Sequence, residues 1–301
     1  MILIMNMITI MISMMLSIAF FTILERKILS YMQIRKGPNK VSMMGLLQPI
    51  ADAIKLFNKN IFMPKNSNFM FNIMTPSLSF MLALMILPIL SFQIPHSMDS
   101  SINMIMIMII STLSVYSILL ISWSSNSKYS NLGMMRNIAQ LISYDINFFM
   151  VMITMMIMFS SFNSMNFNFM NYPIWLMLGT MPLMILWLIL CWSETNRSPF
   201  DFAEGESELV SGFNVEYMGG LFAMIFLAEY LMMIILSFIT SILFSNFPHL
   251  FSMIITMMIS LLFLFSRGSY PRFRFDLLMK FNWKFVLPIT MSLINISIFM
   301  F

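Results

Sequence analysis

Long apolar runs separated by short charged segments dominate the pattern along the chain. A helix needs about 20 apolar residues to cross a bilayer, and residues 1–24 carry no charge before Glu25, Arg26 and Lys27. The pattern predicts an all-α polytopic membrane protein with eight transmembrane helices. The predicted spans are residues 1–24, 69–91, 102–123, 137–161, 174–193, 218–244, 250–266 and 285–301.

The basic residues support this count of spans. All sixteen lysines and arginines fall in the connections 25–68, 124–136, 194–217 and 267–284. These four connections lie on one side of the membrane if the helices alternate in direction, as the positive-inside rule requires. We therefore expect a single integral membrane domain over residues 1–301, with the N-terminus outside and the basic loops inside.

The first inner loop contains a different kind of helical pattern. Polar residues at Gln48, Asp52, Lys55 and Lys59 lie on one helical face, and apolar residues occupy the other. The apolar positions are Leu46, Leu47, Ile50, Ile54 and Phe57. Such a segment is typical of an amphipathic helix that lies in the membrane interface.

Composition narrows the possible functions. Hydrophobic residues make up 59% of the chain, charged residues 9%, and the mean hydropathy is +0.87, which excludes a soluble globular protein. The single cysteine, Cys191, cannot ligate an iron–sulfur cluster, and the two histidines cannot hold several haems. No glycine-rich phosphate loop is present. We expect no metal, nucleotide or redox cofactor in this chain, and no nucleic acid partner.

The third inner loop, residues 194–217, is acidic on the side where the other loops are basic. It contains Arg197 as its one base, and Ser198-Pro199 with Asp201 predicts the start of a short helix. The six acids of this loop are Glu194, Asp201, Glu204, Glu206, Glu208 and Glu216. Stacked like charges repel, so helix capping alone does not explain them. A proton relay, a cation site and a docking surface for a basic partner are all consistent with the pattern.

Two further acids lie inside predicted spans. Asp145 is about 12 Å into the fourth span and Glu229 about 17 Å into the sixth, at 1.5 Å per residue. Burial of either acid costs several kcal/mol, and no lysine or arginine lies within a span to pair with them. We expect both acids to be protonated or to face an internal water cavity. Tyr144 and Tyr230, their neighbours in sequence, are candidates for extending a hydrogen-bonded path.

Several of these segments match one family. They are ERKILSYMQIRKGPNK from Glu25, GLLQPIADAIKLF from Gly45, SYD from Ser143, the acidic segment from Glu194 and YPRFRFDLLM from Tyr270. On these motifs, and along nearly the whole length, the chain resembles the chain 1 family of NADH-ubiquinone oxidoreductases in its mitochondrially encoded form. Members of this family are quinone-site membrane subunits of respiratory complex I.

The resemblance implies a ubiquinone tunnel and an acidic relay. Candidate tunnel residues are Glu25, Arg26, Arg35, Asp52, Arg197, Asp201, Phe226 and Arg274. Candidate relay residues are Asp145, Glu194, Glu204, Glu206, Glu208, Glu216, Glu229, Tyr144 and Tyr230. Asp145 stands where the family usually has Glu, so the acid is retained with a reach shorter by one methylene.

The same resemblance implies the setting of the chain. Ubiquinone would be the substrate, and FMN and iron–sulfur clusters would be held by partner subunits. The expected partners are peripheral quinone-site and iron–sulfur subunits, other membrane-arm subunits and the lipid bilayer. The expected location is the mitochondrial inner membrane, with the N-terminus in the intermembrane space and the charged loops in the matrix. Two alternatives from the residues alone are a stand-alone cation/proton antiporter and a structural anchor for a peripheral arm.

Overall fold

The structure is a computed structural model that describes residues 2–60, 64–65, 67–90, 101–164, 180–202, 205, 212–245 and 249–300. All the regular elements in these residues are helical. The long helices are α1 (Ile2–Met32), α3 (Phe69–Ile86), α4 (Asn103–Ser125), α5 (Lys128–Phe159), α10 (Gly219–Phe244), α11 (His249–Ser269) and α13 (Leu287–Met300). The short ones are η1 (Met43–Gly45), α2 (Gln48–Phe57), α8 (Met181–Glu194), η2 (Gly212–Asn214), α12 (Phe275–Phe281) and the π-helical turn η3 (Asn282–Val286).

The predicted fold class is confirmed. Among the described residues, seven helical segments are long and apolar enough to cross a membrane, the last of them continuing from α12 through η3 into α13. The fifth predicted span corresponds to the shorter helix α8, since residues 174–179 lie outside the described residues. The count of eight spans therefore stays a prediction.

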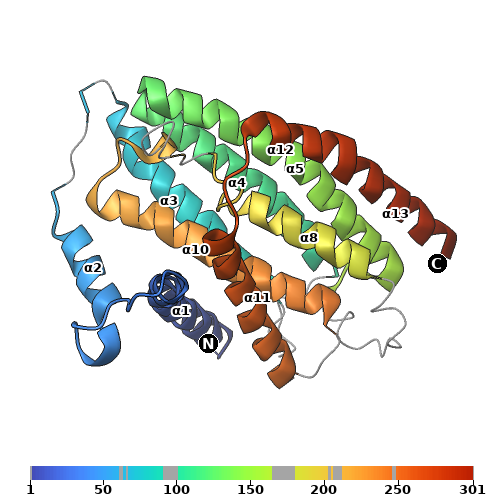
Figure 1. Ribbon diagram of the computed structural model, residues 1–301, viewed down its shortest axis with the longest axis horizontal. Coiled ribbons are helices and arrows are strands. Elements are labelled where there is room, and N and C mark those ends of the chain that lie inside the picture. The colour runs from blue at the N-terminus through green and yellow to red at the C-terminus, as the bar shows by residue number, and fades with distance from the viewer. Residues whose placement is uncertain are drawn as a thin grey trace.

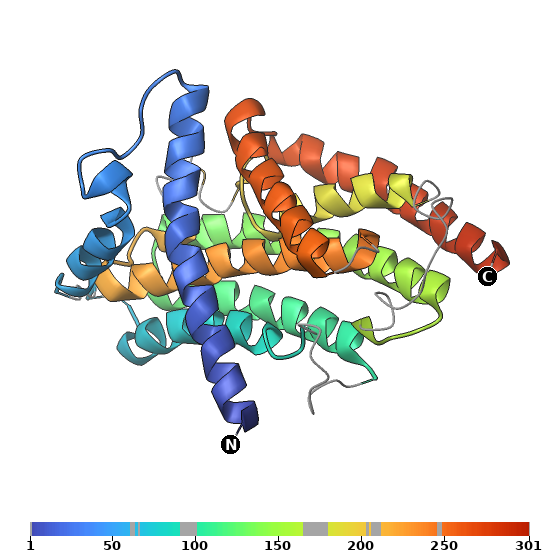
Figure 2. The same cartoon turned by 90° about the horizontal axis from the view of Figure 1, so that it is seen from below.

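Most of the bundle runs in one direction. Helices α3, α4, α5, α8, α10 and α13 lie roughly along a common axis, and α1 and α11 cross them steeply (Figures 1 and 2). Backbone hydrogen bonds join the ends of the basic connections: Asn68 N donates to Ser124 O at 3.1 Å, and Phe273 N to Pro199 O at 3.2 Å. We call this end of the bundle the loop end.

Several helices extend beyond the predicted spans. Helix α1 continues to Met32, so Glu25 and Arg26 lie within it. Helix α5 begins at Lys128 and not near residue 137, because Ser127 and Ser130 form a capping box that satisfies the first backbone N–H groups. Much of the predicted loop 267–284 is also helical. Charges end a hydropathic run without ending a helix, because backbone hydrogen bonding does not depend on hydropathy.

The two predicted helices of the inner loops have different outcomes. Helix α2 is present, and Ile50, Ile54 and Phe57 on its apolar face are each more than half exposed, as an interfacial helix requires. The predicted helix start at Ser198-Pro199 is wrong, since residues 198–202 form an irregular turn. Burial of Phe200 and Phe202 in the core holds this turn against the bundle. Most of the later positions of that predicted helix lie outside the described residues.

Helix α5 is central to the packing. The rings of Phe148 and Trp187 stack at 4.7 Å and join α5 to α8. On another face, Asn147 donates to the Asn282 side chain at 2.6 Å, and Thr290 donates to Asn147 at 3.2 Å. These buried amide contacts fix α5 against η3 and α13, so the position of Asp145 is set from two sides.

Gly133, near the start of α5, allows the closest approach between α5 and η2. A Cβ atom there would lie 3.2 Å from Phe213 N and 3.3 Å from Gly212 Cα. We expect Gly133→Val to destabilise the fold by about 1–3 kcal/mol, because the added methyl groups must displace backbone atoms. The measurement is the thermal stability of the assembled complex. Gly205→Val is the matched control, since the nearest atom to a Cβ there is a flexible arginine side chain at 3.4 Å. Equal effects of the two substitutions would contradict this reading.

Candidate functional site

Two buried carboxyl groups meet near the centre of the bundle. Asp145 of α5 and Glu194, the last residue of α8, are joined by a side-chain hydrogen bond. Asp145 is 6% exposed, and its Oδ1 accepts no hydrogen bond within the described part of the chain. A carboxylate can only accept, so a hydrogen bond between two carboxyl groups requires a proton on one of them. The two carboxyl groups are thus placed so that they can share a proton.

A glutamine holds the end of α8 in this position. The Gln140 amide on α5 donates to Ser193 O at 3.2 Å and to Phe200 O at 3.0 Å. Its two N–H groups thus join the last turn of α8 to the turn that follows it. Gln140 is fully buried, so both bonds form away from water, where loss of a partner is costly. The geometry of Glu194 follows from this anchor.

Glu229 has a basic partner, contrary to expectation. Arg197 Nη2 lies 3.5 Å from Glu229 Oε2, with side-chain exposures of 9% and 18%. The guanidinium carbon of Arg197 is also 4.7 Å from the centre of the Tyr230 ring, which is within range for a cation–π contact. The sequence missed this partner because Arg197 comes from the loop after α8 and not from a span. No span needs to contain a base for Glu229 to be paired.

Tyr230 connects this pair to α1 and α11. Its hydroxyl donates to Glu25 Oε2 at 2.6 Å, and the other carboxylate oxygen of Glu25 pairs with Arg267. Glu25 is 4% exposed. Four charged groups and one phenol therefore alternate across the bundle in the order Glu229, Arg197, Tyr230, Glu25 and Arg267.

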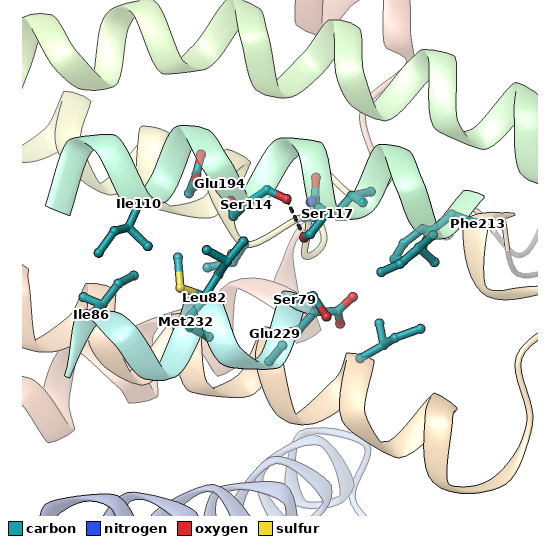
Figure 3. Close-up of a pocket in the computed structure, with 17 residues that line it drawn as sticks. Ser79, Leu82, Ile86, Ile110, Ser114, Ser117, Glu194, Phe213, Glu229 and Met232 are labelled. Atoms are coloured by element: carbon teal, nitrogen blue, oxygen red, sulfur yellow. Dashed lines mark hydrogen bonds between the residues drawn. The ribbon is translucent and has the colours of Figure 1, made fainter. Parts of the chain in front are cut away.

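A cavity lined by both polar and apolar side chains lies among α3, α4, α10 and the end of α8. It has a volume of about 60 Å³, and both Glu194 and Glu229 line it. Figure 3 shows Ser114 and Ser117 of α4 facing Ser79 of α3 and Glu229 across this cavity. One water needs about 30 Å³ and two to four polar partners, so the cavity has room and partners for about two waters. The two acidic clusters therefore open onto the same cavity.

Other predicted residues form ion pairs nearer the surface. Arg26 Nη1 lies 2.7 Å from Asp52 Oδ2 and ties α1 to α2, with both side chains at least one third exposed. Arg272 lies 3.1 Å from Asp201. Arg274 pairs with Asp276 and is 80% exposed. Such exposed pairs contribute little to stability, and Arg274 lies away from the buried cluster.

The remaining predicted residues are distributed as follows. Glu204, Glu206 and Glu208 lie outside the described residues. Glu216 is half-buried in the turn before α10, and Arg35 is exposed after α1. The Tyr144 hydroxyl donates to Leu278 O at 3.2 Å, so this bond joins α5 to α12 and does not extend the acidic path. Phe226 lies beside Arg197, with 6.0 Å between the ring centre and the guanidinium carbon.

Sequence reasoning missed Arg267, Ser79, Ser114 and Ser117. Arg267 had been interpreted only as one of the bases that fix the topology. The three serines could have been found from their spacing. Ser114 and Ser117 share a helical face on α4, and Ser79 lies seven residues after Asn72 on one face of α3. A polar stripe on an apolar helix indicates a face that contacts protein or water in preference to lipid.

Comparisons with known proteins match nearly the whole chain to one family. The family model described as NADH dehydrogenase matches residues 5–299. The chain is 45% identical over 300 residues to NADH-ubiquinone oxidoreductase chain 1 of Osphranter rufus, covering 96% of this chain and 94% of the relative. The protein of the same name from Ornithorhynchus anatinus is 47% identical over 295 residues, covering 95% and 92%. That from Notamacropus eugenii is 46% identical over 298 residues, covering 96% and 93%.

Proposed function

Because this chain belongs to the NADH dehydrogenase family and is a membrane subunit of the NADH-ubiquinone oxidoreductase, we propose that it forms part of the ubiquinone tunnel and couples quinone reduction to proton translocation. The oxidoreductase is the enzyme, and other complex I subunits are its partners. The chain is a multi-pass protein of the inner membrane. The N-terminus faces the intermembrane space and the loop end faces the matrix, in accordance with the positive-inside distribution of bases.

The quinone half of this proposal is supported by the residues between α1, α2 and α10. The Arg26–Asp52 pair fixes the amphipathic helix α2 against α1. Gly219, at φ +64°, lets the start of α10 lie against the carbonyl groups of Leu56 and Lys59 at the end of α2. Ubiquinone, a lipid-soluble molecule, reaches the site from the bilayer between these elements. Its headgroup is reduced by electrons from the peripheral quinone-site and iron–sulfur subunits, which hold the FMN and the clusters.

The second part of the proposal, coupling to proton translocation, is supported by one observation. Glu194 and Glu229 line the same cavity, while Arg197 joins Glu229 through Tyr230 to Glu25 on α1. A chain of alternating charges thus extends from the helix beside α2 to the proton-sharing pair Asp145–Glu194. Glu204, Glu206, Glu208 and Glu216 belong to the same acidic loop, and we include them in the proposed relay on that ground.

Coupling in this arrangement is electrostatic. Electrons added to the quinone create negative charge before its protons arrive, and this charge attracts the Arg197 guanidinium away from Glu229 toward Tyr230 and Glu25. At an effective dielectric constant of about 20, two unit charges 4 Å apart interact with an energy of about 4 kcal/mol. Glu229 therefore takes up a proton from the Asp145–Glu194 pair through water in the cavity. Protonation of the quinone returns Arg197 and releases that proton into the membrane arm.

We expect Glu194→Gln to lower quinone-coupled NADH oxidation by about a hundredfold, the lower limit for a positioned proton-transfer group. Glutamine can still hydrogen-bond to Asp145, so the local structure is retained while the shared proton is lost. The measurements are NADH oxidation with quinone and with an artificial acceptor, and proton uptake into vesicles containing the complex. Oxidation with the artificial acceptor should be unchanged, because it uses only the peripheral arm.

Asp276→Asn is the matched control, since Asp276 is an exposed acid near the loop end. It should leave all three measurements unchanged. Quinone-coupled oxidation and pumping by Glu194→Gln at the level of Asp276→Asn would contradict the relay. That result would instead support a purely structural anchor.

A further inference from the structure

The Tyr217 hydroxyl lies in a buried cluster of polar groups that the relay does not use. It donates to Ile121 O at 3.0 Å or to Asn72 Oδ1 at 3.2 Å. Its oxygen also lies 2.9 Å from Ser124 Oγ and 3.4 Å from Thr75 Oγ1. Tyr217 is 6% exposed, and Asn72, Thr75 and Ser124 are each 2% exposed or less. One phenol therefore joins the turn before α10 to both α3 and α4.

The hydrogen bonds in this cluster can be rearranged. A phenol has one proton, and two pure acceptors compete for it, the Ile121 carbonyl and the Asn72 side-chain oxygen. Ser124 Oγ can supply Ile121 O in place of the phenol, because it lies 2.9 Å from the same oxygen. Thr75 and Ser124 can each donate to or accept from Tyr217. Such a cluster can pass a proton by reorienting its hydroxyl groups.

The cluster lies between the loop end and the cavity. Ser124 is tied to the loop end by the hydrogen bond from Asn68 N to its carbonyl oxygen. Asn72, Thr75 and Ser79 recur at spacings of three and four residues on one face of α3, and Ser79 lines the cavity. Thr75 and Ser79 are four residues apart on α3, a rise of about 6 Å along the helix axis. One water between their hydroxyls spans this distance with two hydrogen bonds of about 2.8 Å.

The second helix offers the same polar face. On α4, Ser117 lines the cavity and lies seven residues before Ser124, the serine that contacts Tyr217. The polar positions of α3 therefore extend from the phenol to the cavity that Glu194 and Glu229 line, and on α4 Ser124 and Ser117 mark the two ends of the same route, with Ile121 between them. Asn196 Oδ1 also borders this cavity and has no hydrogen-bond partner among the described residues, although Asn196 is only 8% exposed. A buried acceptor of this kind indicates bound water.

We propose that Tyr217 is a hydroxyl relay that passes protons from the loop end into the cavity shared by Glu194 and Glu229, along a route separate from the quinone tunnel. The inference rests on the proposed function, since it supplies protons to that relay. In each transfer Tyr217 accepts a proton from water or Ser124 and gives its own proton to Thr75. Thr75 passes its proton through one water to Ser79, and water in the cavity carries it to the Asp145–Glu194 pair, where it replaces the proton that this pair gave to Glu229. No residue on the route changes its net charge until the proton reaches that pair.

The environment of Tyr217 favours a neutral relay over an ionised one. Burial raises the pKa of Tyr217 above its ordinary value, so the phenol keeps its proton between transfers. Its ring packs among Ile121, Phe213, Leu221 and Ile225. The ring alone accounts for this packing, and a phenylalanine would supply it.

We expect Tyr217→Phe to lower quinone-coupled proton pumping by about ten- to a hundredfold. A positioned proton-transfer group typically contributes at least about a hundredfold, so this expectation is conservative. The pumping rate should also fall more steeply in D2O than that of the unsubstituted complex, because hydroxyl transfer becomes limiting. Oxidation of NADH with an artificial acceptor should be unchanged. Tyr116→Phe is the matched control, since Tyr116 lies on α4 with 63% exposure and should alter none of these rates.

Thr75 provides a second pair of variants. Thr75→Val removes the hydroxyl with nearly the same shape and should reproduce the effect of Tyr217→Phe, whereas Thr75→Ser keeps the hydroxyl and should pump normally. The proposal is overturned if Tyr217→Phe matches Tyr116→Phe in pumping and in its D2O response, or if the two Thr75 variants pump equally. Glu194→Gln tested in parallel separates the two ideas. A deficit in Glu194→Gln with none in Tyr217→Phe refutes only the Tyr217 route, and normal pumping by Glu194→Gln refutes the acidic relay itself.

Discussion

Replacement of Arg197 by methionine should destabilise the bundle by about 3–5 kcal/mol, the cost of leaving one member of a buried ion pair without its partner. Glu229 would keep its carboxyl group at 18% exposure with no guanidinium beside it. The cation–π contact with Tyr230 would also be lost. We expect a strong reduction in the amount of assembled complex, measured by native electrophoresis and by thermal unfolding.

A double substitution distinguishes the ion pair from simple loss of packing. Arg197→Met combined with Glu229→Gln leaves no unpaired charge and should recover much of the lost stability. Quinone-coupled activity should stay low in the double variant, because both relay groups are absent. A double variant that is as unstable as the sum of the two single variants would show that Arg197 and Glu229 do not interact energetically.

The second large effect is expected for Arg267→Met. Glu25 is 4% exposed and pairs with Arg267, so the substitution leaves a buried carboxylate with only the Tyr230 hydroxyl. Because Arg267 is 37% exposed, water replaces part of the lost attraction, and about 2–3 kcal/mol of destabilisation is expected. Quinone reduction should slow with it, since Glu25 connects α1 to the Arg197 cluster. The measurements are thermal stability and the rate of quinone reduction as a function of quinone concentration.

Arg274→Met is the control for Arg267→Met. The sequence named Arg274 as the tunnel arginine of this segment, but its side chain is 80% exposed and pairs with the exposed Asp276. An exposed pair is worth at most about 1 kcal/mol, so Arg274→Met should be close to neutral in stability and in quinone reduction. A larger effect of Arg274→Met than of Arg267→Met would contradict the assignment of Arg267 to the site.

The ion pairs in the described part of the chain differ from the arrangement of acids that the sequence predicted. An array of acids without basic partners was expected, with each acid neutral or solvated. Within the described residues, Asp145 lies against Glu194, and Glu229 is matched by Arg197. The two arrangements behave differently, because a matched pair changes its protonation only when its partner moves. The coupling that we propose through Arg197 would need a displacement of one side chain and no rearrangement of the helices.

Much of the fold could be predicted from the sequence. Apolar runs of membrane length predicted the helical class, and the placement of every base on one side predicted the topology. The spacing of Ile50, Ile54 and Phe57 predicted helix α2. These features depend on local composition and on periodicity within one element, which a sequence states directly. Helix ends were less predictable, because α1 continues through Glu25 and Arg26 without a break.

The contacts of the site were not predictable in the same way. Asp145 and Glu194 are 49 positions apart, Arg197 and Glu229 are 32 apart, and Glu25 and Arg267 are 242 apart. Asp145 and Glu229 could be identified as costly to bury, but their partners could not. Arg267 and Arg274 are separated by only seven residues, but Arg267 is in the last turn of α11, and only the packing of α11 against α1 brings it to Glu25.

The sequence by itself determined the membrane class, the family and the set of ionisable groups. Only the tertiary structure decided which of those groups touch: that Glu229 has a basic partner, that Asp145 shares a hydrogen bond with Glu194, and that Tyr217 joins α3 to α4. The reason is that hydrophobic burial acts on whole faces of helices and is recorded in local patterns. Hydrogen bonds and ion pairs act over about 3–4 Å, and such distances between remote residues exist only after the helices have packed.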